Sequence, residues 1–223
     1  MRRLFTCFLF LLLLLSATCF AQQTDIRQFA AYSAFTYLST PSLNLYQRGF
    51  NGDFGVNLRP WLTMGFDFGT YNGNNSLVPS YLNPTLAALL PPIPGLYVPG
   101  HATTYTYEAG PQLNYRHFKH LTLFVRPALG ALHMNWECTS TDPLTQLIVK
   151  GLTGGSLGVK DTVVFYGFGG GATWEITPNF GIRVASDFVR FNVFSDTLNG
   201  PRNSVRVSIG TKFGFGKNIV ANK

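Results

Sequence analysis

The sequence predicts an all-β protein, an eight-stranded antiparallel up-and-down transmembrane β-barrel. Three observations predict it: an export signal at the start, two-faced strand-like stretches, and alternating short and long connections. The clearest stretch is 204–215, where Val205 and Val207 share one face and Arg206 and Lys212 the other. A membrane barrel turns the apolar face to lipid and the polar face to its lumen, and a soluble β-protein does the reverse.

Residues 1–21 have the character of a cleaved secretory signal peptide. Two arginines precede a Leu/Phe-rich run over 4–15, which is too short to span a bilayer, and small residues precede a cut after Ala21. An uncleaved anchor is the alternative. Cleavage would lower the formal net charge from +7 to +5 and leave Cys138 as the only cysteine. We therefore expect an exported chain without an intrachain disulfide.

The rest of the chain favours strands over helices almost throughout. A short helix is expected only over 82–90, where prolines lie on both sides. Most strand candidates are long for a soluble protein and match a tilted membrane strand. The expected strands are 26–38, 47–58, 61–72, 102–115, 120–134, 161–176, 180–193 and 203–216.

The connections between these strands alternate in length. Short turns are expected near 59–60, 116–119 and 177–179, and longer segments at 39–46, 73–101, 136–160 and 195–202. Short periplasmic turns and longer outer loops are typical of outer-membrane barrels. This rhythm predicts that both termini lie in the periplasm.

Alternation within the strands assigns a lipid face and a lumen face. In the second and third strands Phe54, Phe66 and Phe68 oppose Asp53 and Asp67. The first strand alternates only weakly.

In the seventh strand the phase slips, because Val189, Phe191 and Val193 follow on the parity opposite to Phe188. We expect a β-bulge near Phe188 there.

The predicted lumen face carries the only concentrated charge. An eight-stranded barrel is just wide enough for side chains to fill, so these charges must pair or hydrate. The simpler interpretation is a structural polar plug; the alternative is a gated narrow passage or a small-ligand cavity. The predicted lumen charge network is Asp53, Asp67, Glu108, Arg126, Arg183, Asp187, Arg206 and Lys212.

Aromatic residues at the expected strand ends suggest girdles at the two membrane interfaces. The alternative is that they are ordinary strand-end aromatics. The periplasmic set includes Trp61, Tyr115, Trp174 and Phe180, and the outer set Tyr71 and Trp136.

With these features the chain resembles the small OmpA/OmpX-type outer-membrane β-barrel proteins over nearly all of 22–216. The resemblance implies a porin-like barrel domain in the outer membrane, in contact with lipid and lipopolysaccharide. It also implies that the barrel-assembly machinery reads the last strand, with Phe213 and Phe215. One departure is a short tail, 217–223, because such chains commonly end on the aromatic residue.

Other functions are less well supported by the residues. A lipid A-modifying enzyme would need a serine, histidine and carboxylate, but Asn135 occupies the place where a serine would follow His133. Cys138 lacks a metal-ligand partner, so no metal or cofactor is expected, and no basic run suggests nucleic acid. Loops 73–101 and 136–160 are candidate sites for an extracellular ligand. The main competitor is a secreted soluble barrel that binds an apolar ligand, with Phe66, Phe68, Val125 and Val207 inside.

Overall fold

A computed structural model describes residues 23–88 and 96–220, which form a closed antiparallel barrel. The expected signal peptide and the last three residues lie outside the described residues. Eight strands follow one another around the barrel, and β1 pairs with β8 to close it. The strands are β1 Arg27–Thr40, β2 Leu45–Arg59, β3 Leu62–Leu77, β4 Val98–Tyr115, β5 Leu121–Cys138, β6 Gly158–Thr177, β7 Phe180–Phe191 and β8 Arg202–Asn218.

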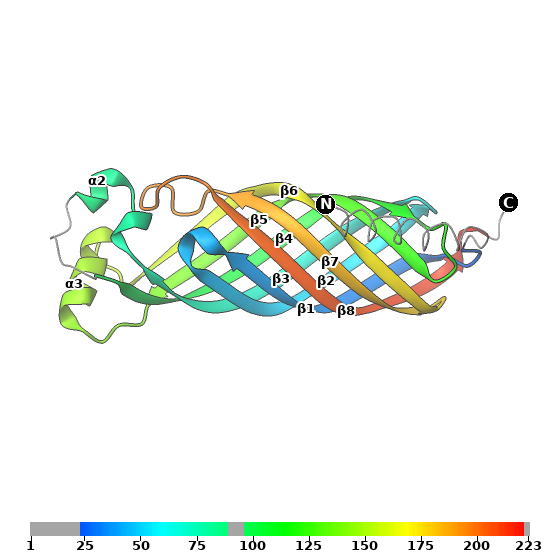
Figure 1. Cartoon of the computed structure of the whole chain (residues 1–223), viewed down its shortest axis with the longest axis horizontal. Helices are drawn as coiled ribbons and strands as arrows, with labels where there is room; N and C mark the ends of the chain where they lie inside the picture. Colours follow the sequence, from blue (N-terminus) through cyan, green and yellow to red (C-terminus); the bar gives the residue numbers. More distant parts are fainter. Residues whose placement is uncertain (1–22, 89–95, 221–223) are drawn as a thin grey trace, which may run out of the picture.

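The two ends of the barrel differ, as Figure 1 shows. At one end β2–β3, β4–β5 and β6–β7 are joined by short turns, and β1 begins and β8 ends there. We call this the short-turn end and the opposite end the long-loop end. The fold class predicted from the sequence is confirmed, and several strands extend further toward the long loops than expected.

The long-loop end carries all the helices of the described residues. These are two 3₁₀ turns, η1 (Pro41–Leu43) and η2 (Pro79–Tyr81), and the helices α2 (Pro84–Ala87) and α3 (Pro143–Leu152). The helix expected over 82–90 is thus only one turn in its described part, since Leu82 pairs with Leu198. None of these helices is long and apolar enough to cross a membrane.

The outer surface of the barrel is apolar over most of its height. Phe66 is 50% exposed, Val125 59% and Val207 44%, and Phe68 also faces outward. Because a soluble barrel would bury these side chains, the soluble alternative is wrong. The exterior fits a hydrocarbon environment, with the charged face of the same strands turned inward.

The predicted β-bulge near Phe188 is wrong. From Gly181 to Phe191 β7 keeps a continuous register with both neighbours, with Phe188 outside and Val189 and Phe191 buried inside. The apolar residues change face because the lumen itself becomes apolar toward the long-loop end. The backbone does not slip.

A bulge does occur at the end of β8. The register against β1 shifts between Arg27 and Phe29, and Gly216 adopts a positive φ of 86° there. Glycine accepts this conformation without the strain a side chain would cause. The strand therefore continues to Asn218, two residues into the expected tail, and Ile219 donates to the carbonyl of Ile26.

We expect Val125→Arg to destabilise the barrel in a bilayer by about 2–4 kcal/mol if Val125 lies near the bilayer midplane, because an outward arginine there must enter hydrocarbon. The matched change Leu147→Arg, on the exposed face of α3, should have an effect near zero. Urea unfolding of the barrel reconstituted in lipid vesicles measures both. Equal effects of the two substitutions would contradict a lipid-facing belt.

Candidate functional site: a divided lumen

An ionic cluster crosses the middle of the lumen. The Arg206 guanidinium lies 2.7 Å from Glu108 Oε2, 2.8 Å from Asp187 Oδ2 and 3.4 Å from Asp67 Oδ1. All four side chains are buried. One cation from β8 thus contacts carboxylates from three other strands.

Arg126, from β5, contacts the same carboxylates from the other side. Its guanidinium lies 3.1 Å from Asp187, 3.4 Å from Asp67 and 3.7 Å from Glu108, and it reaches Asp53 on β2 at 3.3 Å. We use the name ionic cluster for these two arginines and four carboxylates.

The strand register explains why the cluster forms at this level. Asp53 is the cross-strand partner of Asp67, and Asp67 is the partner of Glu108. Three adjacent carboxylates repel one another strongly in a low-dielectric interior, so two arginines between them relieve the repulsion. Space for the Asp187 carboxylate comes from Gly169, which is the register partner of both Arg126 and Asp187.

The other two predicted lumen cations lie toward the short-turn end. Arg183 stacks over the Phe124 ring at 4.0 Å, donates to Gln112 at 2.6 Å and stays 3.7 Å from Asp53. Lys212 does not join the ionic cluster; its ammonium lies 2.5 Å from Glu175 Oε1.

Toward the short-turn end, sequence reasoning missed two charged lumen residues, Glu175 and Arg116. Glu175 follows the outward Trp174, so alternation on β6 was the available signal, but the glycine run 167–171 obscured it. Arg116 was assigned to a turn, yet its side chain turns back inside and donates to Asn57 at 3.0 Å. With these two, five carboxylates and five cations face the lumen from the ionic cluster to the short-turn end.

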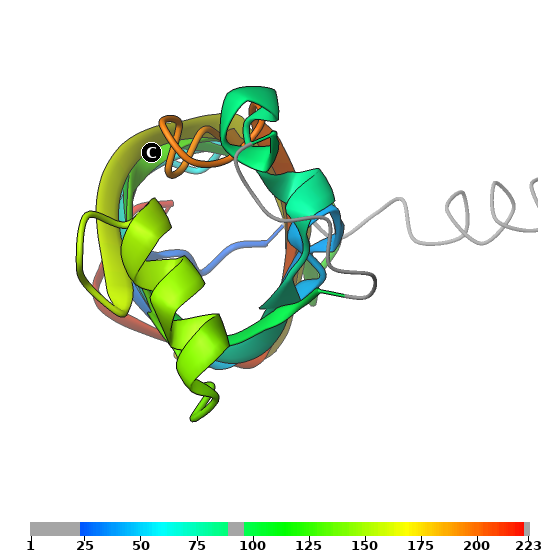
Figure 2. The same ribbon diagram turned by 90° about the vertical axis from the view of Figure 1, so that its left-hand side faces the viewer.

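The lumen below the cluster is polar and partly open. A cavity of about 40 Å³ lies between the ionic cluster and the pair Lys212–Glu175, which is enough for a few water molecules. Beyond it, the first described residues cross the bore, as the blue segment in Figure 2 shows. Gln23 is buried there and bonds to Thr122.

Above the cluster, toward the long-loop end, the lumen is filled by closely packed side chains. We call this group the apolar layer, although two polar residues belong to it. Every member is less than 2% exposed. The layer consists of Leu45, Gln47, Tyr71, Leu132, Met134, Phe165 and Phe191. The expectation of a charged network throughout the lumen therefore holds only from the cluster to the short-turn end.

Tyr71 and Trp136 were predicted for the outer aromatic girdle, and both predictions are wrong. Both rings lie inside the barrel, because each polar atom finds a partner there. The Tyr71 hydroxyl is 3.3 Å from Thr106 Oγ1, and the Trp136 indole donates to Asn75 at 2.9 Å.

The remaining predicted aromatic residues face outward near the short-turn end. Trp61, Tyr115 and Trp174 are exposed and Phe180 is half-buried. In the terminal strand Phe213 and Phe215 also face outward, where they contact Phe180 and Phe29 respectively.

No catalytic constellation is assembled by the histidines of the described residues. His133 lies on the outer surface and bonds to Thr162 at 2.7 Å, and His120 contacts the Glu175 carbonyl at the short-turn end. Among the described residues no three His, Cys, Asp or Glu side chains are placed to hold a metal ion.

These features define a class of protein: a closed eight-stranded antiparallel barrel with a lipid-compatible exterior, the fold of the small outer-membrane β-barrels. Among solved structures, the outer membrane protein OprG from Pseudomonas aeruginosa matches 88% of this chain and 99% of its own, with a TM-score of 0.52 and 8% identity.

Two further structures match less well. The attachment invasion locus protein Ail of Yersinia pestis and Neisserial surface protein A both have a TM-score of 0.45, at 16% and 14% identity. They cover 83% and 84% of this chain, and 96% of each is matched. No protein-family model and no curated protein sequence matches the chain.

We expect Arg206→Ala to lower the free energy of unfolding by about 3–5 kcal/mol, because it leaves buried carboxylates without their cation. Arg190→Ala, which removes an exposed arginine from the neighbouring strand, should cost no more than about 1 kcal/mol. Urea unfolding in lipid vesicles, followed by tryptophan fluorescence, compares the two. Similar losses would mean that the cluster adds nothing beyond a surface charge.

Gly169→Ala and Gly110→Ala should have opposite effects, although both glycines face the lumen. A methyl group at Gly169 would overlap the Asp187 carboxylate and displace it from both arginines, and at Gly110 it would meet open space. We expect a loss of about 1–3 kcal/mol for the first and a small gain for the second, since alanine suits a strand better than glycine. The same unfolding assay distinguishes them, and a gain at both positions would refute the packing argument.

Proposed function

We propose that this protein is a structural outer-membrane barrel whose lumen is closed to solutes and which carries out no catalysis. The observation that supports this best is that two barriers follow one another along the lumen. The ionic cluster links β2, β3, β4, β5, β7 and β8 across the lumen, and the apolar layer seals the space above it.

The orientation that we propose places the long-loop end outside the cell and both termini in the periplasm. The asymmetry of the connections supports it, since outer-membrane barrels have short periplasmic turns. The apolar belt would then contact outer-membrane lipid and lipopolysaccharide. The outward rings of Phe213 and Phe215 on the last strand are the part we propose for recognition by the assembly machinery.

A gated narrow passage is the second candidate. The polar cavity beside the cluster favours it. Asp53 and Arg183 line that cavity, and the Asp53 carboxylate pairs with both Arg183 and Arg126. Exchange of ion-pair partners could then open a path from the short-turn end. This candidate requires the apolar layer to open as well.

Planar-bilayer conductance distinguishes the two candidates. We expect the wild type and Glu108→Ala to show no steady conductance, because the apolar layer remains intact in both. Phe165→Ala alone should also stay closed, since the ionic cluster remains. The combination of the two substitutions should conduct, because it weakens both barriers.

Conductance of the combined variant would show that the assay can detect a pore of this size. Conductance of the wild type would overturn the proposed closed lumen. Conductance of Glu108→Ala alone would favour the gated passage, with the ionic cluster as its gate.

A further inference from the structure

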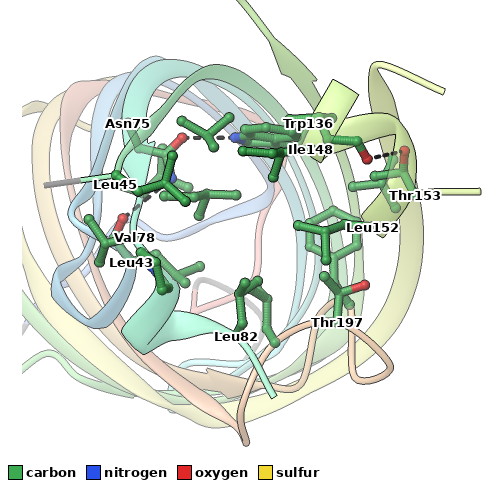
Figure 3. A pocket seen from close by; sticks show the side chains of 18 of the residues that line it. Leu43, Leu45, Asn75, Val78, Leu82, Trp136, Ile148, Leu152, Thr153 and Thr197 are labelled. Carbon is green, nitrogen blue, oxygen red and sulfur yellow. Dashed lines mark hydrogen bonds between the residues drawn. The ribbon is translucent and has the colours of Figure 1, made fainter. Parts of the chain in front are cut away.

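An apolar pocket lies inside the mouth of the barrel at the long-loop end. Its volume is about 60 Å³, and Figure 3 shows its side chains arranged around an open centre. Its wall comes from segments that are far apart in the sequence: Leu43 at the end of η1 and Leu45 just after it, Leu82 just after η2, and Ile148 and Leu152 from α3.

The helix α3 lies across the mouth of the barrel and forms one side of the pocket (Figure 2). Its N-terminus is capped by Asp142, whose carboxylate accepts from the Thr145 amide at 2.8 Å. Hydrogen bonds from Thr145 hold the pKa of the Asp142 carboxyl below its usual range. The helix turns Ile148 and Leu152 to the pocket and leaves Leu147 68% exposed.

The wall of the pocket offers almost no polar group to a ligand. The Asn75 amide accepts from Trp136 and donates to the Leu43 carbonyl at 3.3 Å, so both of its ends are occupied. The Thr153 hydroxyl donates to the Val149 carbonyl at 2.8 Å. Among the described residues, none of the buried side-chain polar atoms that lack a partner belongs to this wall.

The pocket is closed toward the inside of the barrel. Leu45 and Met134 belong to both its wall and the apolar layer. Beneath them, Tyr71 and Phe165 separate the pocket from the ionic cluster. A molecule that enters from the long-loop end is therefore retained in a dead end.

We propose that this pocket binds one small, uncharged apolar molecule, of the size of a xenon atom or a very short alkane, because its volume of about 60 Å³ is too small for an aromatic ring. Dry apolar cavities bind such molecules because the site gives up no water–protein hydrogen bonds. Among the described residues that line the wall no side chain is charged, which disfavours an ionic ligand, and the volume is too small for a polypeptide segment. This inference does not depend on whether the lumen below conducts.

The natural fluorescence of Trp136 provides a test, because its ring lies in the pocket wall. The chain has three tryptophans, and the other two, Trp61 and Trp174, face outward near the opposite end. A variant with Trp61→Phe and Trp174→Phe therefore reports on the pocket alone. Xenon, a heavy-atom quencher with the proposed size and chemistry, is equilibrated at increasing pressure with this variant in lipid nanodiscs.

We expect quenching of Trp136 to saturate with increasing xenon concentration. A second variant that keeps only Trp61 measures the quencher dissolved in the lipid, and its quenching should rise without saturation. Leu152→Phe, which fills the pocket, should raise the half-saturating concentration by about tenfold or more. Leu147→Phe, on the exposed face of the same helix, should change it less than about twofold.

Unsaturated quenching of Trp136, parallel to that of Trp61, would overturn the proposal. Equal effects of Leu152→Phe and Leu147→Phe would do the same. Heat-modifiable migration in detergent gels checks that each variant is folded. If Leu152→Phe does not fold, Leu82→Phe fills the pocket from the opposite wall.

Discussion

The structure depends on one constraint: the five carboxylates and five cations of the lumen must balance one another's charge inside a barrel that is too narrow to hydrate them. Removing charges from water costs several kcal/mol per ion, and only close pairing with good geometry offsets it. Arg206 meets this requirement with three carboxylates between 2.7 and 3.4 Å. Because these partners come from β3, β4 and β7, the cluster joins strands on opposite sides of the barrel across its lumen.

The inside of the barrel is divided by chemistry. From the cluster to the short-turn end, charges, amides and a small polar cavity fill the space, and Lys212–Glu175 forms a second, separate pair. From the apolar layer to the long-loop end, the lumen resembles the core of a soluble protein, with Phe165 and Phe191 nearly completely buried. The outside of the barrel is apolar beside both regions, so only the inner face of each strand changes character along its length.

This division explains how much of the molecule could be predicted from its sequence. Where the lumen is polar, alternation separates the two faces, and residues such as Asp67 and Arg206 could be placed inside. Where the lumen is apolar, both faces of a strand carry similar side chains, so the period of two disappears. Val189 and Phe191 then suggested a bulge, although they only continue the inward face.

The predictions for Tyr71 and Trp136 were wrong for a related reason. Position near a strand end does not determine which face of the strand a ring occupies. Their inward orientation depends on Thr106 and Asn75, partners that only the closed barrel brings close. Pairing of Lys212 with Glu175 also needs the three-dimensional arrangement, since 37 residues separate them.

The two barriers in the lumen differ in how they respond to the surroundings. Ion pairs weaken when salt screens them or when protons neutralise the carboxylates, whereas packing of Leu132 against Phe165 has no such dependence. On the proposed function, the apolar layer therefore keeps the long-loop end closed under conditions that loosen the ionic cluster. It also lies between the pocket and the ionic cluster, so that a molecule in the pocket does not contact the charges at the centre of the barrel.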